Sequence, residues 1–269
     1  QCAINRSEMR NGMIFDSHAH YDDKAFDEDR DELLSSFENN GIGYVTDIGA
    51  DMESSEEAVR LSEKYPFIYA AVGLHPDAVN ENTDGNMKRL RELAISDKVV
   101  AIGEIGLDYH YEPEKKAEQK VCFETQLSLA RDVSLPVVIH SREAAKDTLD
   151  IMKYHNAGDL GGVIHCFSYG KEMAREYLNM GFYIGVGGVI TFNNAKKLKE
   201  VVEYVPLESI VIETDCPYLA PVPNRGKRNS SLNLPYVVKA ISEIKGVPEQ
   251  EIIDITCENA LRMYRIKKS

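Results

Sequence analysis

Short apolar runs alternate with longer segments of mixed polarity along the whole chain. The short runs are rich in Val, Ile, Phe and Tyr and predict strands, whereas the longer segments show the apolar spacing of helices. The predicted strands are Ile14–His18, Tyr44–Ile48, Ile68–His75, Val99–Glu104, Val137–His140, Val163–Cys166, Phe182–Val186 and Ile210–Thr214. The predicted helices are Asp29–Asn39, Ser54–Tyr65, Met87–Ser96, Lys115–Asp132, Ala144–Tyr154, Lys171–Met180, Ala195–Tyr204 and Leu234–Ile244, followed by a helical segment, Pro248–Ile266.

This alternation predicts an α/β fold built on a parallel sheet. The strands are apolar almost without interruption, which is typical of strands that helices cover on both faces. Eight consecutive β/α units match a closed (β/α)₈ TIM barrel of the metal-dependent hydrolase type, and we expect that fold. A doubly wound open sheet uses the same alternation, so the element count alone does not exclude it.

The chain has the length of one large barrel. It contains 269 residues, and a (β/α)₈ barrel usually takes ~250. No low-complexity linker divides it, so we expect a single catalytic domain over residues 13–269, preceded by an N-terminal extension or expression remnant, residues 1–12. This first segment is polar and lacks the apolar stretch of a signal peptide. The apolar runs also fall short of the ~18 residues of a membrane span.

Cysteine usage and charge narrow the class of protein. The five cysteines are scattered without Cys-x-x-Cys spacing, which is typical of reduced thiols in a cytosolic protein, so we expect a cytoplasmic location. The 44 acidic residues outnumber the 31 basic ones and give a formal net charge of −13. Because a surface that attracts nucleic acid as a whole is normally basic, this balance argues against that class but leaves room for a local anion site.

Histidines gather at the ends of the predicted strands. Five of the seven lie at or just past the carboxyl end of a strand: His18, His20, His75, His140 and His165. In a (β/α)₈ barrel the active site is built at this end. His18 and His20 are two residues apart, so both imidazoles face the same side of an extended chain and can bind one ion. The alternative, two surface histidines on a loop, is weakened by the apolar strand before them.

The same alternation places carboxylates at the rim. Val100, Ile102 and Glu104 are expected to share one face of their strand, so Glu104 would end a row of interior side chains. On the last strand, Glu213 and Asp215 align in the same way, with Asp215 at the exit. A buried carboxylate without a partner is costly, and this favours a cation beside it.

Together these side chains form a set of nitrogen and oxygen ligands: His18, His20, Glu104, His140, His165 and Asp215. Imidazole with carboxylate suits zinc, manganese or iron and tolerates magnesium. A single open catalytic zinc site uses ~3 protein ligands, so six predict two divalent metal ions (Mg, Mn or Zn), with Glu104 as the bridge between them. A closed structural metal site is the alternative.

Six segments, in this order, resemble the TatD family of metal-dependent hydrolases: FDSHAH (Phe15–His20), GLHP (Gly73–Pro76), GEIGLDY (Gly103–Tyr109), HSR (His140–Arg142), HCF (His165–Phe167) and ETDCPYL (Glu213–Leu219). The resemblance spans essentially Met13 to the C-terminus. It implies a TIM-barrel enzyme that is usually a deoxyribonuclease and requires divalent ions.

The resemblance also implies a division of the ligands. His18, His20, Glu104 and Asp215 correspond to the ligands of the first metal, and Glu104, His140 and His165 to those of the second. Many relatives in the wider group place a modified lysine between the metals, whereas this chain has a glutamate there, as TatD proteins do. The family often has an acidic residue after Arg-Asn; Arg228–Ser231 has none, which leaves the role of that loop open.

Other residues near the strand ends are candidates for holding a substrate. Arg225 lies in a cationic loop after the last strand and is expected to grip a phosphate; the alternative is a solvated basic loop. His75 is a second candidate for contacting a phosphate or leaving group, unless it is a structural histidine. Tyr109 and Phe167 have rings that could stack on bases, although packing is the favoured role for both.

We therefore expect a metal-dependent deoxyribonuclease that hydrolyses DNA exonucleolytically, acting on a single strand or an end. Water activated by the metals would attack phosphorus. Glu104 and Asp215 are the expected catalytic residues, and Asp215 would orient the nucleophile or take its proton. One alternative is a hydrolase of a small amide, lactone or phosphoester on the same fold. Another is a non-catalytic metal-binding partner protein.

Overall fold

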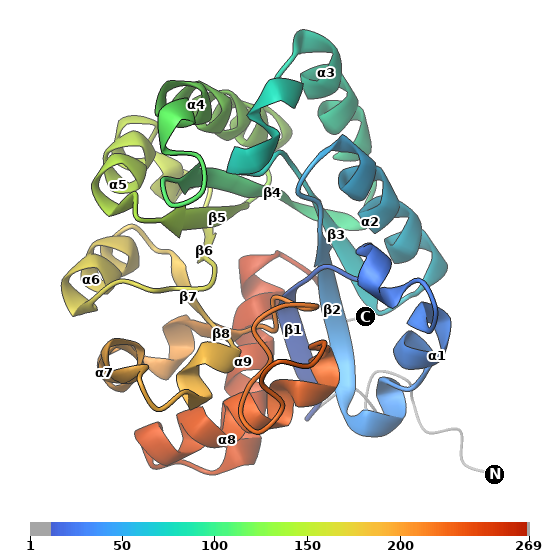
Figure 1. Ribbon diagram of the computed structural model, residues 1–269, viewed down its shortest axis with the longest axis vertical. Coiled ribbons are helices and arrows are strands. Elements are labelled where there is room, and N and C mark those ends of the chain that lie inside the picture. The colour runs from blue at the N-terminus through green and yellow to red at the C-terminus, as the bar shows by residue number, and fades with distance from the viewer. Residues whose placement is uncertain (1–11, 268–269) are drawn as a thin grey trace.

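The strands form one continuous parallel sheet that closes into a barrel. The computed structural model describes residues 12–267, in which the sheet has the order β1 to β8. Figure 1 shows the strands around a central axis with the helices outside them. The strands are β1 Ile14–Ala19, β2 Ile42–Ile48, β3 Ile68–Val72, β4 Val99–Asp108, β5 Val137–Arg142, β6 Gly162–Ile164, β7 Tyr183–Val186 and β8 Ile210–Ile212. The predicted (β/α)₈ barrel is confirmed. The predicted N-terminal extension, residues 1–12, lies outside the described residues except for Gly12.

The ring closes between the first strand and the chain that follows the last. Backbone hydrogen bonds join the Asp215 N–H to the His18 carbonyl and the His20 N–H to the Cys216 carbonyl, both at 2.9 Å. β6 and β8 end one residue before His165 and Glu213, so the predicted site residues lie just beyond these strands. Closure therefore brings the HAH segment of β1 against Asp215.

Helices follow the strands in alternation and cover the outside of the barrel. They are α1 Arg30–Ser35, α2 Met52–Lys64, α3 Asp84–Leu93, α4 Lys116–Val133, α5 Ala145–Tyr154, α6 Lys171–Asn179, α7 Lys196–Tyr204, α8 Leu234–Lys245 and α9 Glu249–Met263. Local sequence sets several ends: Asp51 and Ser54 form a capping box at the start of α2. α1 is shorter than predicted because a separate 3₁₀ turn at Glu38–Asn40 leads into left-handed Gly41. No helix within residues 12–267 is long and apolar enough to span a bilayer.

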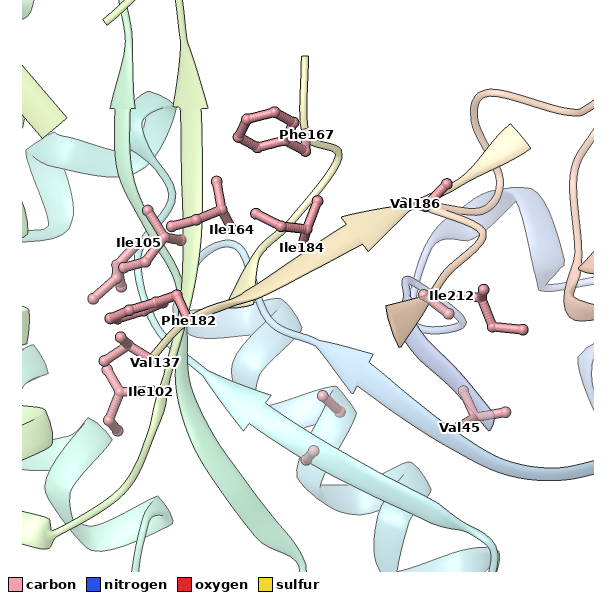
Figure 2. Close-up of a cluster of buried hydrophobic side chains, with 14 of the residues drawn as sticks. Val45, Ile102, Ile105, Val137, Ile164, Phe167, Phe182, Ile184, Val186 and Ile212 are labelled. Atoms are coloured by element: carbon pink, nitrogen blue, oxygen red, sulfur yellow. The ribbon is translucent and has the colours of Figure 1, made fainter. Parts of the chain in front are cut away.

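The apolar core has an outer and an inner part. The outer core lies between the sheet and the helices and includes Ile102, Ile105, Val137 and Ile184, several of which point away from their strands in Figure 2. The inner core combines side chains from inside the barrel with side chains of the last helix, α9: Phe15, Tyr44, Val100, Val138, Val163, Val211, Ala260, Leu261, Met263 and Tyr264. The two cores explain the nearly continuous apolar strands.

α9 seals the N-terminal end of the barrel. The Phe15 ring lies 5.3 Å from that of Tyr44 and 6.0 Å from that of Tyr264. The Tyr264 hydroxyl donates to the Ser17 carbonyl at 2.7 Å. The Asn259 amide donates to the carbonyl of Ile210, where β8 begins. This end is consequently filled and covered, and the opposite end holds the polar side chains.

An extra residue in β1 turns the two histidines into the barrel. Asp16 pairs with Val45 and Ala19 with Asp47, so three steps along β1 match two along β2. Phe15 belongs to the inner core and Ala19 to the outer core, a switch that regular alternation does not produce. Such bulges re-aim side chains next to active sites. Here the irregularity gives His18 the interior position that it would otherwise lack.

A second irregularity corrects the prediction for β4. Val100, Ile102 and Glu104 do not share a face, because Ile102 packs in the outer core while Val100 packs in the inner core. Between Ile102 and Ile105 the strand again has one residue more than β5. This extra residue returns the side chain of Glu104 to the interior of the barrel. Glu104 therefore lies at the rim as predicted, but the prediction that it shares a face with Val100 and Ile102 is wrong.

Candidate metal centre

Three predicted ligands meet at the junction of β1 and the chain after β8. The Nε2 atoms of His18 and His20 lie 3.2 Å apart. Asp215 Oδ1 lies 3.6 Å from the first and 3.4 Å from the second. All three ligand atoms are within 4.8 Å of one another. They form a compact group that can hold one cation.

Glu104 connects this group to a second one. Its Oε2 atom lies 3.4 Å from His18 Nε2 and 3.9 Å from His20 Nε2. Its Oε1 atom lies 2.7 Å from His140 Nδ1 and 2.6 Å from His165 Nε2. One carboxylate therefore presents one oxygen to each group of histidines, and this is the geometry of a bridging ligand.

Hydrogen bonds behind the ligands fix how the rings present their nitrogens. The Nδ1 atom of His20 lies 2.8 Å from the Ile48 carbonyl; because a carbonyl only accepts, Nδ1 carries a proton, and Nε2 is the nitrogen that faces Asp215. The Nε2 atom of His140 lies 3.1 Å from Asp108 Oδ2, which leaves Nδ1 facing Glu104. Metal-binding histidines are typically held by a carbonyl or carboxylate in this way.

Burial and mutual contact shift the protonation of these groups. Burial opposes ionisation of Glu104, but the charge and hydrogen bonds of His165, His140 and His18 outweigh it and hold its pKa well below the usual value. The pKa of Asp215 is also lowered: burial raises it, and the neighbouring histidines lower it more. Burial, then His165, lowers the pKa of His18 to about 4. For His20 and His140 burial also lowers the pKa, but hydrogen bonds and charge from the neighbouring carboxylates outweigh it and raise the pKa to about 10 and about 9. Because metal ligands must be deprotonated, a cation that binds here would displace these protons.

The donor set fits divalent cations. Ring nitrogens of His18 and His20 converge with oxygens of two carboxylates, and such nitrogen and oxygen donors are common zinc and manganese ligands. His75 is nearby, with Nε2 3.9 Å from Glu104 Oε1, and forms a third group of possible ligands with Glu104 and His140. The structure thus brings all six predicted ligands and His75 into one cluster at the C-terminal end of the barrel.

The candidate substrate residues have different surroundings. Arg225 packs its guanidinium 4.1 Å above the Phe192 ring and stays at the surface. Arg228 in the same loop pairs with Asp29. The Tyr109 hydroxyl donates to Asp147, and Phe167 is buried in the outer core. Packing, the favoured role for both rings, agrees with these contacts.

Two carboxylates behind the centre were not predicted as site residues. Asp108 supports His140, as described above, and it also accepts the N–H groups of His110 and Tyr111. Glu213 is fully buried, accepts the Cys166 N–H and lies 3.8 Å from His165 Nδ1. Each lies close to a ligand in sequence, four residues after Glu104 or two before Asp215. This closeness in sequence to a predicted ligand is the feature by which the two carboxylates could have been identified from the sequence.

Comparisons with known proteins agree with this geometry. Residues 15–265 match the family model described as TatD related DNase. The chain is 43% identical over 254 residues to an uncharacterized metal-dependent hydrolase, YabD, of Bacillus subtilis, covering 94% of this chain and all of that one. It is 32% identical over 257 residues to a protein of Cronobacter sakazakii named 3'-5' ssDNA/RNA exonuclease TatD, covering 93% and 97% of the two chains.

A solved structure shares the whole architecture. The crystal structure of YJJV, a TatD homolog from Escherichia coli, superposes with a TM-score of 0.89 at 30% identity. The match covers 96% of this chain and 100% of that one. The similarity therefore includes the barrel, its loops and the segment that carries the candidate metal centre.

Proposed function

Because this chain belongs to the TatD family of metal-dependent hydrolases, we propose that it is a nuclease that removes nucleotides from an end of single-stranded DNA. The observation that carries the proposal is the position of Glu104, with one oxygen toward each group of histidines. Two metal ions ~3.5–4 Å apart, bridged by one carboxylate, suit an in-line displacement at phosphorus, in which both the attacking and the leaving oxygen need stabilisation.

His18, His20, Asp215 and Glu104 would hold one divalent ion, and Glu104, His140 and His165 the other. When bound, such ions supply Lewis acidity and neutralise the charge of the phosphate. Asp108 would keep His140 in the tautomer that offers Nδ1, since it holds Nε2 at 3.1 Å. The two ions would also offset the acidic character of the chain at the place where a phosphate must bind.

Asp215 would also receive the proton of the attacking water. Its side chain is 18% exposed, compared with 5% for Glu104, so it is the more accessible of the two carboxylates. Its lowered pKa keeps it ionised and able to accept a proton near neutral pH. Glu104 is enclosed by histidines and would act as a bridging ligand.

His75 would donate a hydrogen bond to the phosphate. Its Nδ1 atom accepts the backbone N–H of Asp77 at 3.2 Å, so the ring proton lies on Nε2, which faces the centre. An N–H donor placed there stabilises negative charge that develops on a phosphate oxygen.

Arg225 would contribute positive charge from the loop after β8. The neighbouring Arg228 is engaged with Asp29 and the Ala25 carbonyl, whereas Arg225 contacts the Phe192 ring by one face and keeps its N–H donors for an anion. The relative from Cronobacter sakazakii, named a 3'-5' exonuclease, favours the 3' end as the point of attack.

The test is cleavage of a 5'-labelled single-stranded oligonucleotide with Mg²⁺, Mn²⁺ or Zn²⁺, resolved by product length. We expect a metal-dependent ladder of labelled fragments that shortens with time. Labelled mononucleotide as the first product would indicate attack at the 5' end, and internal fragments would indicate an endonuclease. Absence of cleavage with all three metals, or faster turnover of a small amide, lactone or phosphoester, would overturn the proposal.

A further inference from the structure

A cavity of about 240 Å³ lies directly beside the metal centre. It is enclosed by the loops that follow β6, β7 and β8 and by the start of α7. Asp215 forms part of its wall, so the cavity opens onto a candidate metal ligand. A group bound there would be adjacent to the phosphate at the centre.

The cavity has apolar walls and a few polar groups. Phe167 and Leu198 contribute apolar surface, whereas Asn194 and Lys197 bring an amide and an ammonium group. Apolar walls with a few polar groups are typical of sites for planar organic ligands. The volume is below the ~300–1,000 Å³ of sites for drug-sized molecules, which suits a single nucleobase.

Glu213 supplies a buried polar oxygen in this cavity. Its side chain is fully buried and lines the cavity. Oε1 accepts the Cys166 N–H, whereas Oε2 is buried and has no hydrogen-bond partner. Gly185 makes room for this oxygen, because a Cβ atom there would lie 2.5 Å from Oε2. A buried polar oxygen without a partner is costly, and a polar group of a ligand would satisfy it.

We infer that this cavity binds the nucleobase of the terminal nucleotide whose phosphodiester lies at the metal centre, and that the Oε2 atom of Glu213 forms a hydrogen bond with that base. The inference rests on the proposed nuclease function. The edge of every base carries N–H and carbonyl groups, so each of the four bases can offer this oxygen a hydrogen-bond partner.

A blocking variant tests whether the base enters the cavity. Ala195 lines the cavity at the partly exposed start of α7, so Ala195→Trp would fill the entrance. The neighbouring Lys196 is exposed and does not line the cavity, so Lys196→Trp is the matched control. Two oligonucleotides are compared: one with a natural 3'-terminal nucleotide and one with a 3'-terminal tetrahydrofuran residue, which has no base.

We expect Ala195→Trp to lower kcat/KM for the natural end ~10-fold, the usual scale of one base contact, and to change the abasic end less than ~2-fold. Lys196→Trp should leave both values unchanged. An equal effect of Ala195→Trp on both ends, or no effect on either, would overturn the inference while the nuclease function stands. A wild-type protein that cleaves neither oligonucleotide would overturn the nuclease function and this inference with it.

A second measurement tests the contact with Glu213 and does not depend on the folding of the tryptophan variant. The ratio of kcat/KM for the natural 3' end to that for the abasic end is measured in wild type and in Glu213→Met, which keeps the length of the side chain and removes both oxygens. Glu213 also lies near His165, but any loss through that ring affects both substrates equally and cancels in the ratio. We expect a ratio of ~10 in wild type and a smaller one in the variant. A wild-type ratio near 1, or a ratio that Glu213→Met leaves unchanged, would overturn the contact with Glu213.

Discussion

The two ends of the barrel interior use the same strands for opposite purposes. At the N-terminal end Val138 and Val163 join the inner core, which α9 covers. Two residues further along the chain in each case, His140 and His165 face Glu104 at distances of 2.7 and 2.6 Å. One step of alternation therefore separates a packed apolar layer, here called the lower layer, from a layer of candidate metal ligands, here called the upper layer.

The difference shows where stability and function are located. Each apolar side chain buried in the lower layer contributes ~1.5–3 kcal/mol to the free energy of unfolding. The upper layer instead buries groups that lack partners, among them Nδ1 of His18 and of His165, and these cost stability until they are satisfied. It also holds Cys166 and Asp215 at positive φ, a backbone conformation that is unfavourable for these residues.

The largest expected effect comes from the bridging carboxylate. Glu104→Gln removes the charge that both groups of histidines share, so we expect ~10³-fold lower nuclease activity. The increase in Tm that Mn²⁺ gives the wild-type protein should also disappear, because an ion that no longer binds cannot stabilise the fold. The measurements are oligonucleotide turnover and thermal unfolding with and without Mn²⁺.

The control for this variant is Glu118→Gln, which changes an exposed glutamate on α4. It should retain both the activity and the Tm increase. If Glu104→Gln also retained them, the upper layer would not be a metal centre organised by this residue.

The lower layer should respond in the opposite way. Phe15 is fully buried between Tyr44 and Tyr264, so Phe15→Ala should cost ~3–5 kcal/mol of unfolding free energy by loss of burial and creation of a cavity. Activity per folded molecule should change less than ~3-fold. Urea unfolding and turnover below the transition test this, with Phe15→Leu as the variant that keeps most of the volume. Loss of activity without loss of stability would contradict the division between the two layers.

Periodicity predicted the barrel because every strand is apolar and every helix amphipathic, which is enough to specify the layers. It predicted the ligand positions at the rim because a strand end is visible in the sequence wherever Val-rich runs meet His or Glu. The extra residues near His18 and Glu104 were not visible in this way. They depend on how one strand pairs with its neighbour, and this register cannot be predicted from the sequence of one strand alone.

The contacts that two carboxylates, Asp108 and Glu213, make with the histidine ligands from behind could not be predicted from the sequence either. Asp108 reaches His140 from the adjacent strand, and Glu213 approaches His165 from two strands away. Either acidic residue could equally have faced a helix. Only the closed ring and the turns after the strands place these carboxylates behind specific rings.

Substituting a residue that holds a ligand in place should reduce activity less than substituting the ligand itself. Asp108→Asn replaces the charged acceptor at His140 Nε2 with a neutral amide, so Nδ1 is presented to the metal less firmly. We expect ~10–100-fold weaker metal affinity or lower activity, the usual cost of such a change. Activity is measured as a function of Mn²⁺ concentration, and Asp147→Asn, on the outside of the barrel, is the control. An unchanged Mn²⁺ midpoint together with unchanged maximal turnover would mean that Asp108 only shapes its own turn.

The smallest expected effect concerns Asp47, a fully buried residue level with Ala19 near the same end of the barrel. It accepts the Tyr21 N–H through Oδ1, whereas Oδ2 has no partner. Burial, and then Asp22, raise the pKa of this carboxyl well above its usual value. Asp47 therefore extends the polar layer to a residue outside the predicted ligand set.

The sign of the pH dependence follows from that raised pKa. Above pH ~4 the unfolded chain releases the Asp47 proton while the folded protein retains it, so this residue destabilises the fold progressively as pH rises toward the folded pKa. Asp47→Asn removes the titration but leaves a buried amide group unpaired, which limits the net gain to ~1 kcal/mol, or ~2–4 °C in Tm, at pH 8. At pH 4 the variant should gain nothing. Thermal unfolding of both proteins is measured at the two pH values, with the exposed Asp97→Asn as the control. An equal shift in Tm at both pH values would show that the fold does not raise the pKa of Asp47.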